Sequence, residues 1–479
     1  MSHPLKRYAL SALCAAVLSA CAIGPDYQRP SLDLPQQWPN ALAPAENTQA
    51  VSAEWWKSFA DPVLDQLVER ALQHNRDLVK ANARVEEAAA LWGSARADLL
   101  PRLDAGGQFQ RARVSSVGTT SGIPRGATVI GESQSGNLAL SYQLDLWGKF
   151  RRANEAARAD LAATAFARDT TQLSVAAQVA RAYFAVRSLD AQLQTTRDTL
   201  QSREKGLQIQ QKRLNGGLIS ELDFRRYEAE TATARATLPQ IEQALVQAEG
   251  ALQVLIGASP RDIVESQPPR GMALEALKTP PAIPSGLPSS LLTRRPDIRA
   301  SEAQLIAQNA RIGVARAAYL PDIGLTGNLG SESLELADLF TAPARAWSFV
   351  ARLSMPIFDF GKTGAAVDAA TARQKQALAE YEKTIQTAFA ETRLALVSVD
   401  KTRERHTAQN TQTQSLKRAL HLAQLRYENG YSSYLDVLDA QRSLFAAELE
   451  TARAREAQLD AVVNLNLALG GGWKAPSEQ

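Results

Sequence analysis

Few side chains in this sequence combine the residue types and spacing that catalysis or metal binding requires. Gly361, Lys362 and Thr363 resemble the end of a phosphate-binding loop, but Pro356 stands where that loop needs its first glycine. The net charge of +3, with both signs interspersed, gives no nucleic-acid footprint. The histidines beyond the N-terminal segment lack metal-ligand spacing; they are His74, His406 and His421. We therefore expect no enzymatic activity, no cofactor, no metal site and no nucleic-acid partner.

Two carboxylates have a spacing that favours an electrostatic role. Asp436 and Asp439 are three residues apart, so they lie on the same face of a helix. If that face points at a symmetry axis, copies of these carboxylates crowd together within the Debye length of roughly 8 Å. Their repulsion would favour bound cations or raised pKa values. Whether such an axis exists depends on the elements that carry the two residues.

The N-terminal residues indicate export from the cytoplasm. Lys6 and Arg7 precede an apolar stretch from Tyr8 to Val17, which small residues follow. This pattern predicts a signal peptide over 1–20 rather than a membrane span, because the apolar stretch is too short to cross a bilayer.

Cys21 is expected to carry a lipid anchor that includes palmitate. The other cysteine, Cys14, lies in the removable segment, so the mature chain cannot form an internal disulfide. The sequence Leu-Ser-Ala-Cys that ends at Cys21 resembles a bacterial lipobox, in which the cysteine becomes the acylated first residue. An incidental cysteine beside an ordinary signal-peptidase site is the alternative. Ala22 is not the aspartate that typically retains such lipoproteins at the inner membrane, which favours the outer membrane.

The sequence contains two copies of one long unit. Three landmarks recur at a constant offset of 213 residues; the pairs are Gly148 with Gly361, Gly217 with Gly430, and Gly257 with Gly470. The repeats are expected at 61–257 and 297–470. The other segments are a lipid-anchored extended segment at 21–60, a connecting and equatorial segment at 258–296, and a flexible tail at 471–479.

Each repeat should contain a long helical hairpin. Lys149 to Asn215 has no proline and one glycine, Gly206, and is rich in strong helix formers. At about 1.5 Å per residue, such a helix would be roughly 100 Å long. The partner helices are expected at 221–256, 362–429 and 434–469. Glycine stops and capping boxes, at Ser220 to Asp223 and Ser433 to Asp436, mark the turns between the helices.

The segments before the long helices are predicted to be strands of a membrane barrel. In residues 137–146, apolar and polar side chains alternate over ten positions, which is typical of a strand between lipid and water. A similar alternation covers 348–357, and weaker partner strands are expected at 103–109 and 323–329. The strand regions are therefore placed at about 102–147 and 322–358, with hairpins at 110–136 and 330–346.

Four strands cannot close a barrel, and an open sheet edge would leave amide groups unpaired in lipid. Bacterial outer-membrane barrels begin at about eight strands, so an oligomer must complete this one. Two structural alternatives remain open. The strands could form a half-buried pair in a soluble sandwich, and the helices could form a plain coiled coil.

An ordered set of short motifs resembles the outer-membrane factor family, the TolC-like channel subunits, and in particular its lipoprotein branch of the NodT or OprM type. The resemblance covers nearly the whole mature chain. Each motif is weak alone, and the ordered set is highly specific. The motifs are 21–27 with Pro30, Trp55-Trp56, 59–62, 71–75 with Asp77-Leu78, 283–289, 294–298, 430–436 and 438–442.

The resemblance implies an α+β membrane protein that works as a homotrimer. Four strands from each of three protomers would form a twelve-stranded outer-membrane β-barrel, continuous with a long periplasmic α-helical barrel. Residues 55–95, 258–300 and the C-terminal region would form an equatorial belt. The implied partners are a periplasmic adaptor (membrane fusion protein), an inner-membrane pump of the RND type and outer-membrane lipid. The implied function is the passive exit duct of a tripartite efflux pump that exports drugs or other small molecules.

In this family the tips of the helical hairpins form the gate and the adaptor-docking site. The resemblance places gate aspartates at Asp436 and Asp439, gate-locking contacts at Tyr427 and Asp223, and the family's gate arginine at Ser432. The arginines that could replace it are Arg225, Arg226 and Arg442. The candidate adaptor contacts are the turn residues Gly216, Gly217, Ser220, Leu222, Gly430, Ser433 and Leu435.

These tip residues also have purely structural explanations. Asp223 and Asp436 are the fourth residues of the predicted capping boxes, and the glycines could serve only to form the turns. Asp439 differs, because its counterpart in the first repeat is Arg226. The loss of internal symmetry at this position favours a function for Asp439.

Other functions remain as alternatives to the efflux channel. A lipid-anchored periplasmic coiled-coil scaffold would need no membrane strands, and the alternation in 137–146 argues against it. An outer-membrane channel for type I protein secretion would share the whole architecture. A secreted enzyme would need a catalytic constellation that this sequence lacks.

Overall fold

The computed structural model describes residues 22–36, 38, 52–114, 129–280, 289 and 291–472. The expected signal peptide at 1–20, the expected lipid site Cys21 and residues 473–479 of the expected tail lie outside these ranges. Contacts divide the chain into two compact units. The first unit consists of 1–30, 86–163 and 301–380, and the second consists of 31–85, 164–300 and 381–479.

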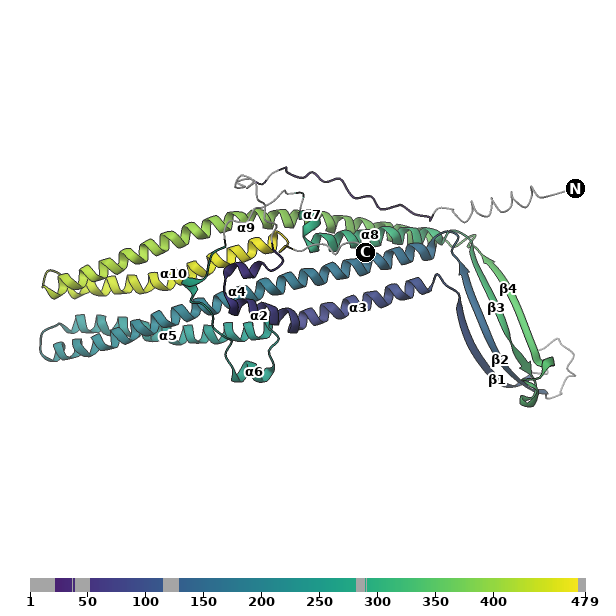
Figure 1. Ribbon diagram of the computed structural model, residues 1–479, viewed down its shortest axis with the longest axis horizontal. Helices are drawn as coiled ribbons and strands as arrows, with labels where there is room; N and C mark the ends of the chain where they lie inside the picture. Colours follow the sequence, from purple (N-terminus) through teal and green to yellow (C-terminus); the bar gives the residue numbers. More distant parts are fainter. Residues whose placement is uncertain are drawn as a thin grey trace. The chain divides into compact units, whose positions relative to one another are not determined.

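Two pairs of long helices account for much of the described chain (Figure 1). Helices α4 (Lys149–Asn215) and α9 (Lys362–Glu428) have 67 residues each, and α5 (Glu221–Leu255) and α10 (Tyr434–Ala468) have 35 each. All four lie within one residue of the bounds predicted from composition and glycine stops. Within the described residues, none of the helices contains an apolar stretch long enough to cross a membrane.

Shorter helices connect these elements with the strands. They are η1 (Trp55–Phe59), α2 (Pro62–His74), α3 (Arg76–Ala97), α6 (Pro260–Glu265), η2 (Leu274–Ala276), α7 (Leu291–Arg294), α8 (Pro296–Ala317), η4 (Leu336–Asp338) and η5 (Ala342–Ala344). Helix α2 starts with a proline after the cap residue Asp61, whose side chain accepts a hydrogen bond from the Val63 amide.

One antiparallel sheet of four strands lies in the first unit, in the order β1-β2-β3-β4. Its strands are β1 (Arg102–Val114), β2 (Val129–Leu144), β3 (Asp322–Ser333) and β4 (Arg345–Ser354). In Figure 1 they run side by side as four long arrows. Sequence neighbours pair throughout, so each of the outer strands β1 and β4 has one edge without a partner strand in the described chain.

The predicted strand boundaries were wrong at both hairpins and at the end of one strand. Residues 330–333 and 345–346, which were assigned to the second hairpin, belong to β3 and β4. Residues 110–114 and 129–136, which were assigned to a hairpin, continue the ladder, and the Arg111–Glu132 ion pair of 3.1 Å joins opposite residues there. Residues 115–128 of that predicted hairpin lie outside the described residues. Strand β4 ends at Ser354 rather than near 358, because Pro356 has no amide proton to extend a ladder.

The strand register places the large apolar side chains of all four strands on one face of the sheet. Leu103 lies opposite Leu140, Leu138 opposite Leu329, and Leu329 opposite Trp347. These side chains are exposed, from 47% for Leu140 to 80% for Trp347. An exposed apolar face that crosses four strands is far from the scattered single residues of an ordinary surface. It needs a partner that is not water.

The second unit has an aromatic and aliphatic core around α2 and α4. Trp55, Trp56 and Phe59 are buried, and the rings of Phe59 and Phe184 lie 4.9 Å apart in an edge-to-face arrangement. Tyr183 beside them is fully buried. Burial of this kind removes the tyrosine hydroxyl from water, so the hydroxyl needs a hydrogen-bond partner inside the protein.

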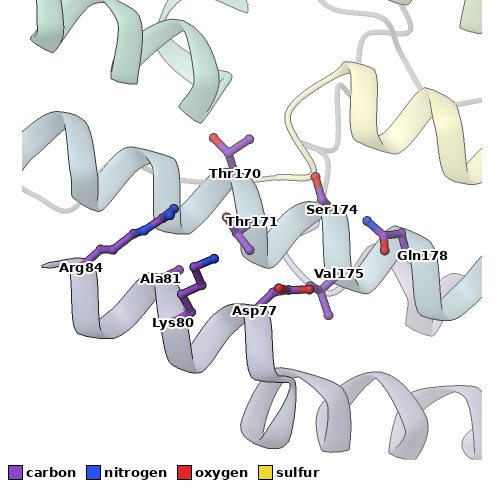
Figure 2. A pocket seen from close by; sticks show the side chains of 9 residues that line it. All are labelled: Asp77, Lys80, Ala81, Arg84, Thr170, Thr171, Ser174, Val175 and Gln178. Atoms are coloured by element: carbon purple, nitrogen blue, oxygen red, sulfur yellow. The ribbon is translucent and has the colours of Figure 1, made fainter. Parts of the chain in front are cut away.

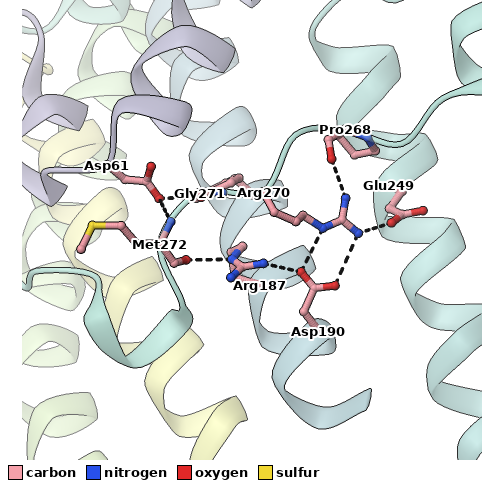
Figure 3. A network of polar contacts seen from close by, with 9 residues as sticks. Asp61, Arg187, Asp190, Glu249, Pro268, Arg270, Gly271 and Met272 are labelled. Carbon is pink, nitrogen blue, oxygen red and sulfur yellow. Dashed lines mark hydrogen bonds and ion pairs between the residues drawn. The ribbon is translucent and has the colours of Figure 1, made fainter. Parts of the chain in front are cut away.

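That partner is Asp61, at the centre of a polar network that holds the connecting segment (Figure 3). Asp61 accepts hydrogen bonds from the Tyr183 hydroxyl at 2.5 Å and from the Met272 amide at 3.0 Å. Burial, and then the hydrogen bond to Asp61, raise the pKa of Tyr183. A Cβ atom at Gly271 would come within 2.3 Å of the Asp61 carboxylate, so only glycine fits this position.

Ion pairs extend the same network along α4 and α5. Arg187 donates to the Met272 carbonyl at 2.9 Å and pairs with Asp190 at 2.6 Å. Arg270 pairs with Asp190 at 3.0 Å and with Glu249. Figure 3 shows these side chains converging on the extended segment that carries Arg270 and Met272. The network therefore fixes the path of residues 268–272 against the helices of the second unit.

Candidate functional site at the tips of the helical hairpins

Two helical turns carry the residues that the sequence singled out. After α4, Gly217 has a φ of +70°, and after α9, Gly430 has a φ of +75°. The next amides, of Leu218 and Tyr431, each donate at 2.8 Å to the carbonyl five residues back, which is the Schellman pattern of helix termination. Left-handed backbone at both positions explains the glycines. Turn formation is thus one role of both residues.

The start of the following helix differs between the two turns. Ser220 accepts a hydrogen bond from the Asp223 amide at 3.1 Å and donates its hydroxyl to the Asp223 carboxylate at 2.7 Å. Ser433 makes no such side-chain cap, so the capping box predicted there was wrong. The Asp436 amide bonds instead to the backbone carbonyl of Ser433 at 3.3 Å. Asp436 is therefore not tied to a capping role.

The two candidate gate aspartates have different surroundings. Asp439 pairs with Arg442, one turn later on α10. Asp436 is exposed and has no ion pair with any described residue. An exposed pair at this spacing contributes little to stability, but it offsets the charge of Asp439 locally. Of the two candidate gate aspartates, Asp436 is therefore the one whose charge no described ion pair offsets.

The arginines proposed to replace the missing gate arginine have partners of their own. Arg226 lies 3.9 Å from Asp223, and Arg225 pairs with Glu228 at 2.9 Å. Arg442 is the one of the three that contacts a candidate gate aspartate. The Ser432 hydroxyl, at the position where the resemblance predicts the family's gate arginine, is buried without a hydrogen-bond partner among the described residues.

An aromatic cluster joins the two hairpins near their tips. Tyr434 packs on Tyr427 with ring centroids 4.9 Å apart, and on Tyr227 at 5.4 Å. Arg213 donates to the Tyr427 hydroxyl at 2.6 Å, and its guanidinium lies 5.9 Å from the ring centroid. The two predicted gate-locking residues thus have separate partners within one chain. Tyr427 contacts Arg213 of α4, and Asp223 contacts Ser220 and Arg226.

Sequence reasoning missed three members of this cluster: Arg213, Tyr227 and Tyr434. One signal was present, since Arg213 and Arg426 are separated by the repeat offset of 213 and each precedes a helix-ending glycine by four residues. Burial, followed by the neighbouring Tyr227, raises the pKa of Tyr434, so its hydroxyl stays neutral. The cluster thus joins the hairpins through neutral tyrosine rings and the guanidinium of Arg213.

Gly206 is explained by the same cluster. Its position on α4 faces Tyr227, and a Cβ atom there would lie 1.7 Å from the tyrosine hydroxyl. We expect Gly206→Ala to displace Tyr227 and to destabilise the protein by about 1–3 kcal/mol. Gly250→Ala is the matched control, because nothing lies within 4 Å of its Cβ position, and it should stabilise by up to about 1 kcal/mol. Thermal unfolding midpoints that shift in the same direction for both variants would contradict this account.

A second group of ionisable residues lies on α10, away from the tips. Burial raises the pKa of Asp460 to about 7, and the nearby Glu456 carboxylate adds to the shift while Arg181 opposes it. Burial also raises the pKa of Glu456, against the effects of Ser188 and Arg453. One carboxylate oxygen of Asp460 is buried without a hydrogen-bond partner.

This arrangement predicts a pH dependence of stability. The ordinary pKa of 3.8 applies to Asp460 in the unfolded chain, and the folded value is about 7, so the folded state binds the extra proton. Its contribution is complete below pH 4 and is lost as the pH rises from about 4 to about 7. Asp460→Asn should flatten this dependence and raise stability at pH 8 by up to about 4 kcal/mol. Identical urea midpoints for both proteins across this range would rule the effect out.

A polar cavity lies between α3 and α4 within the second unit (Figure 2). It has a volume of about 290 Å³. Lys80 and Arg84 extend from α3 toward Thr170, Thr171 and Ser174 of α4.

Comparison with known proteins identifies what this architecture serves. The profile of the outer membrane efflux protein family matches residues 67–258 and 287–471. The toluene efflux pump outer membrane protein TtgF of Pseudomonas putida is 36% identical over 486 residues, which cover 99% of each protein. The cation efflux system protein CusC of Escherichia coli is 34% identical over 464 residues, which cover 96% of this chain and 97% of the relative.

The fold agrees with the sequence relatives. The crystal structure of the Campylobacter jejuni CmeC outer membrane channel superposes with a TM-score of 0.90 at 28% identity and covers 96% of both chains. Long helical hairpins and a sheet with an apolar face thus define an outer-membrane efflux channel protein. The chain belongs to the outer membrane efflux protein family. It is located in the outer membrane and extends into the periplasm, and the family resemblance drawn from the short motifs is confirmed.

Proposed function

We propose that three copies of this chain form one channel that serves as the passive exit duct of a tripartite efflux pump. The observation that carries the proposal is the four-stranded sheet, with an exposed apolar face and two free edges. Lipid can cover the face, but it offers no hydrogen bonds to the edges. Pairing β4 of each copy with β1 of the next would satisfy both edges. The number of copies, and hence a barrel of twelve strands, comes from the resemblance to TolC-like subunits.

The two halves of the chain would contribute equally to the periplasmic helical barrel. The proposed repeats, 61–257 and 297–470, each contain two strands, a helix of 67 residues and a helix of 35 residues. Residues 258–296 would connect them in the equatorial belt. The network around Asp61 and Arg270 supports this role, because it anchors the connection to α2, α4 and α5.

A lipid on Cys21 would attach the chain to the membrane beside the sheet. Cys21 lies outside the described residues, but the next residues are held firmly in the first unit. The Ile23 amide donates to the Trp147 carbonyl at 3.1 Å, and Arg29 forms two hydrogen bonds with Glu302 at 2.6 and 2.7 Å. Trp147 lies three residues after the end of β2, so these contacts of residues 23–29 support a lipid site close to the strand ends.

The gate would lie at the tips of the hairpins. Asp436 and Asp439 are exposed on the first turns of α10, and Arg213, Tyr427 and Tyr434 hold the two hairpins together behind them. In a threefold assembly the carboxylates would face one another across the axis. They would bind cations there, with Asp436 as the stronger ligand because Arg442 offsets Asp439.

The same tips would dock the periplasmic adaptor, which connects the duct to an inner-membrane pump of the RND type. Leu222 is 59% exposed and Leu435 is 47% exposed, beside turns that contain Gly216, Gly217 and Gly430. The neighbouring Leu218 and Tyr431, not among the predicted contacts, are more exposed still. Apolar residues at the tip of a polar hairpin are typical of a protein contact. Ser220 and Ser433 lie in the same turns.

Small molecules are the proposed cargo. Relatives named for toluene and cation efflux support this cargo over the protein cargo of a type I secretion channel. A periplasmic coiled-coil scaffold would have no use for the apolar face of the sheet.

The proposal is tested by fractionation and conductance. We expect the full-length protein to occur in the outer-membrane fraction as a heat-modifiable oligomer and to give discrete conductance steps in planar bilayers. A protein released from membranes by removal of its lipid anchor, without conductance, would instead establish the scaffold.

A further inference from the structure

The loop between β4 and α9 exposes an unusual group of large apolar side chains. This β4–α9 loop comprises residues 355–361, and Ile357 is 89% exposed, Phe358 76% and Phe360 89%. Exposed residues of this size in one short loop indicate a contact surface rather than ordinary solvent exposure. The question is what covers them in the assembled channel.

Hydrogen bonds and a ring contact within the loop hold it in a defined conformation. Asp359 caps α9 by accepting hydrogen bonds from the Gly361 amide at 3.0 Å and the Thr363 amide at 2.8 Å. The rings of Phe358 and Phe360 lie 4.5 Å apart. Phe360 has a φ of +55°, a conformation that costs free energy for a bulky residue. The cap and the ring contact thus hold Phe360 in a preformed, strained position.

The first half of the chain shows what such a loop does when its neighbour is present. Trp147 occupies the position equivalent to Phe360, since 360 minus 147 is the repeat offset of 213. The next residue has a positive φ in both cases, +80° for Gly148 and +84° for Gly361. Trp147 is half-buried, and its indole nitrogen donates at 2.7 Å to the carbonyl of Pro321. It forms part of a cavity lining together with Leu320 and Pro321.

The partner of Trp147 follows from strand order. Pro321 directly precedes β3, and β3 pairs with β2, the strand that leads to Trp147. Phe360 follows β4 in the same way, but no further strand pairs with the outer edge of β4 in the described chain. The residues that correspond to Leu320 and Pro321 are Leu100 and Pro101, which directly precede β1. Leu100 is 68% exposed.

We propose that Phe360 of one copy packs on Leu100 and Pro101 of the next copy, as Trp147 packs on Pro321 within the chain. This inference rests on the proposed closure of β4 against the next copy's β1. That pairing is antiparallel, because strand directions alternate along the sheet, and it brings the end of β4 beside the start of β1. The β4–α9 loop is therefore an intersubunit contact continuous with the strand interface, and its occupant is a second copy of this chain.

Engineered disulfides test the contact in the full-length protein. The double variant Leu100→Cys with Phe360→Cys should form disulfide-linked dimers and trimers when it is exported to the oxidising periplasm. The matched control is Leu100→Cys with Phe340→Cys. Phe340 is 87% exposed but lies in the connection between β3 and β4, at the opposite end of the sheet from Leu100. The control should give no linked species.

The outcomes separate this inference from the proposed function. The oligomeric state of the unmodified protein is measured in parallel by native mass spectrometry. If it is a trimer and the Leu100–Phe360 pair gives no more linked species than the control, the loop contact is overturned while the channel proposal stands. If the unmodified protein conducts ions as a single chain, both the loop contact and the proposed trimeric channel are wrong.

Lipid is the competing occupant of the loop. Phe360→Cys alone should be protected from a membrane-soluble maleimide in the assembled protein, whereas Trp347→Cys, on the apolar face of the sheet, should react. Labelling of both positions at equal rates would mean that lipid covers the loop, and the proposal would be wrong. Phe360→Ser should in addition lower the temperature at which the oligomer dissociates on unboiled gels, and Phe340→Ser should not.

Discussion

Replacing Asp436 and Asp439 together by alanine is expected to yield trimers that assemble normally but leak ions. The carboxylates would bind divalent cations at the constriction, and removing them would release this block. The affinity of the channel for Mg²⁺ should fall at least tenfold, equivalent to about 1.4 kcal/mol. Asp436→Ala alone should produce most of the effect, because Asp439 is already paired with Arg442. Single-channel conductance with and without Mg²⁺ measures both changes.

The control for this prediction is an ion pair of the same type elsewhere. Asp400 pairs with Arg403 at 2.8 Å on α9, three residues apart like Asp439 and Arg442. Asp400→Ala should leave conductance and Mg²⁺ block unchanged. An Asp436→Ala variant that retains wild-type conductance and wild-type sensitivity to large antibiotics would count against the gate assignment.

A second large effect is expected from charges at the docking tips. Leu222→Asp together with Leu435→Asp should abolish efflux while the channel still assembles and conducts. Burying a leucine side chain contributes about 1.5–3 kcal/mol, so losing two such contacts should weaken adaptor binding by at least a hundredfold. Drug accumulation in cells and binding of the cognate adaptor to the purified channel measure the two consequences.

The control here is an equally exposed leucine on a helix shaft. Leu394 is 67% exposed on α9, and Leu394→Asp should leave adaptor binding unaffected if docking is confined to the tips. Equal losses for Leu394→Asp and the double variant would show that the adaptor contacts the helix shafts, and the tip assignment would fail.

The helices and the family could be predicted from sequence because their signals are local. The run from Lys149 to Asn215 contains no proline, which favours one continuous helix. Gly217 and Gly430, with left-handed backbone, mark the ends of α4 and α9. The alternation in 137–146 likewise reflects the two faces of one strand. Strand ends were less predictable, since the polar ladder opposite Arg111 carries no alternation signal.

The arrangement of the candidate site depended on contacts between distant segments. Arg213 and Tyr427 are 214 residues apart, and only the packing of two hairpins brings them together. In the sequence, Gly206 is a glycine that should weaken a helix. The structure explains it, because the hydroxyl of Tyr227, on another helix, leaves no room for a Cβ atom. The side-chain cap predicted at Ser433 was wrong for a similar reason. The capping pattern depends on residue types, and these do not determine which acceptor the Asp436 amide uses.

The stoichiometry of the conducting species is the most direct test of this account. The free edges of β1 and β4 can be satisfied in lipid only by neighbouring copies of the chain. Native mass spectrometry of the detergent-solubilised protein, combined with conductance of the same fraction, should find three chains in every conducting complex. A single chain that conducts ions on its own would contradict it.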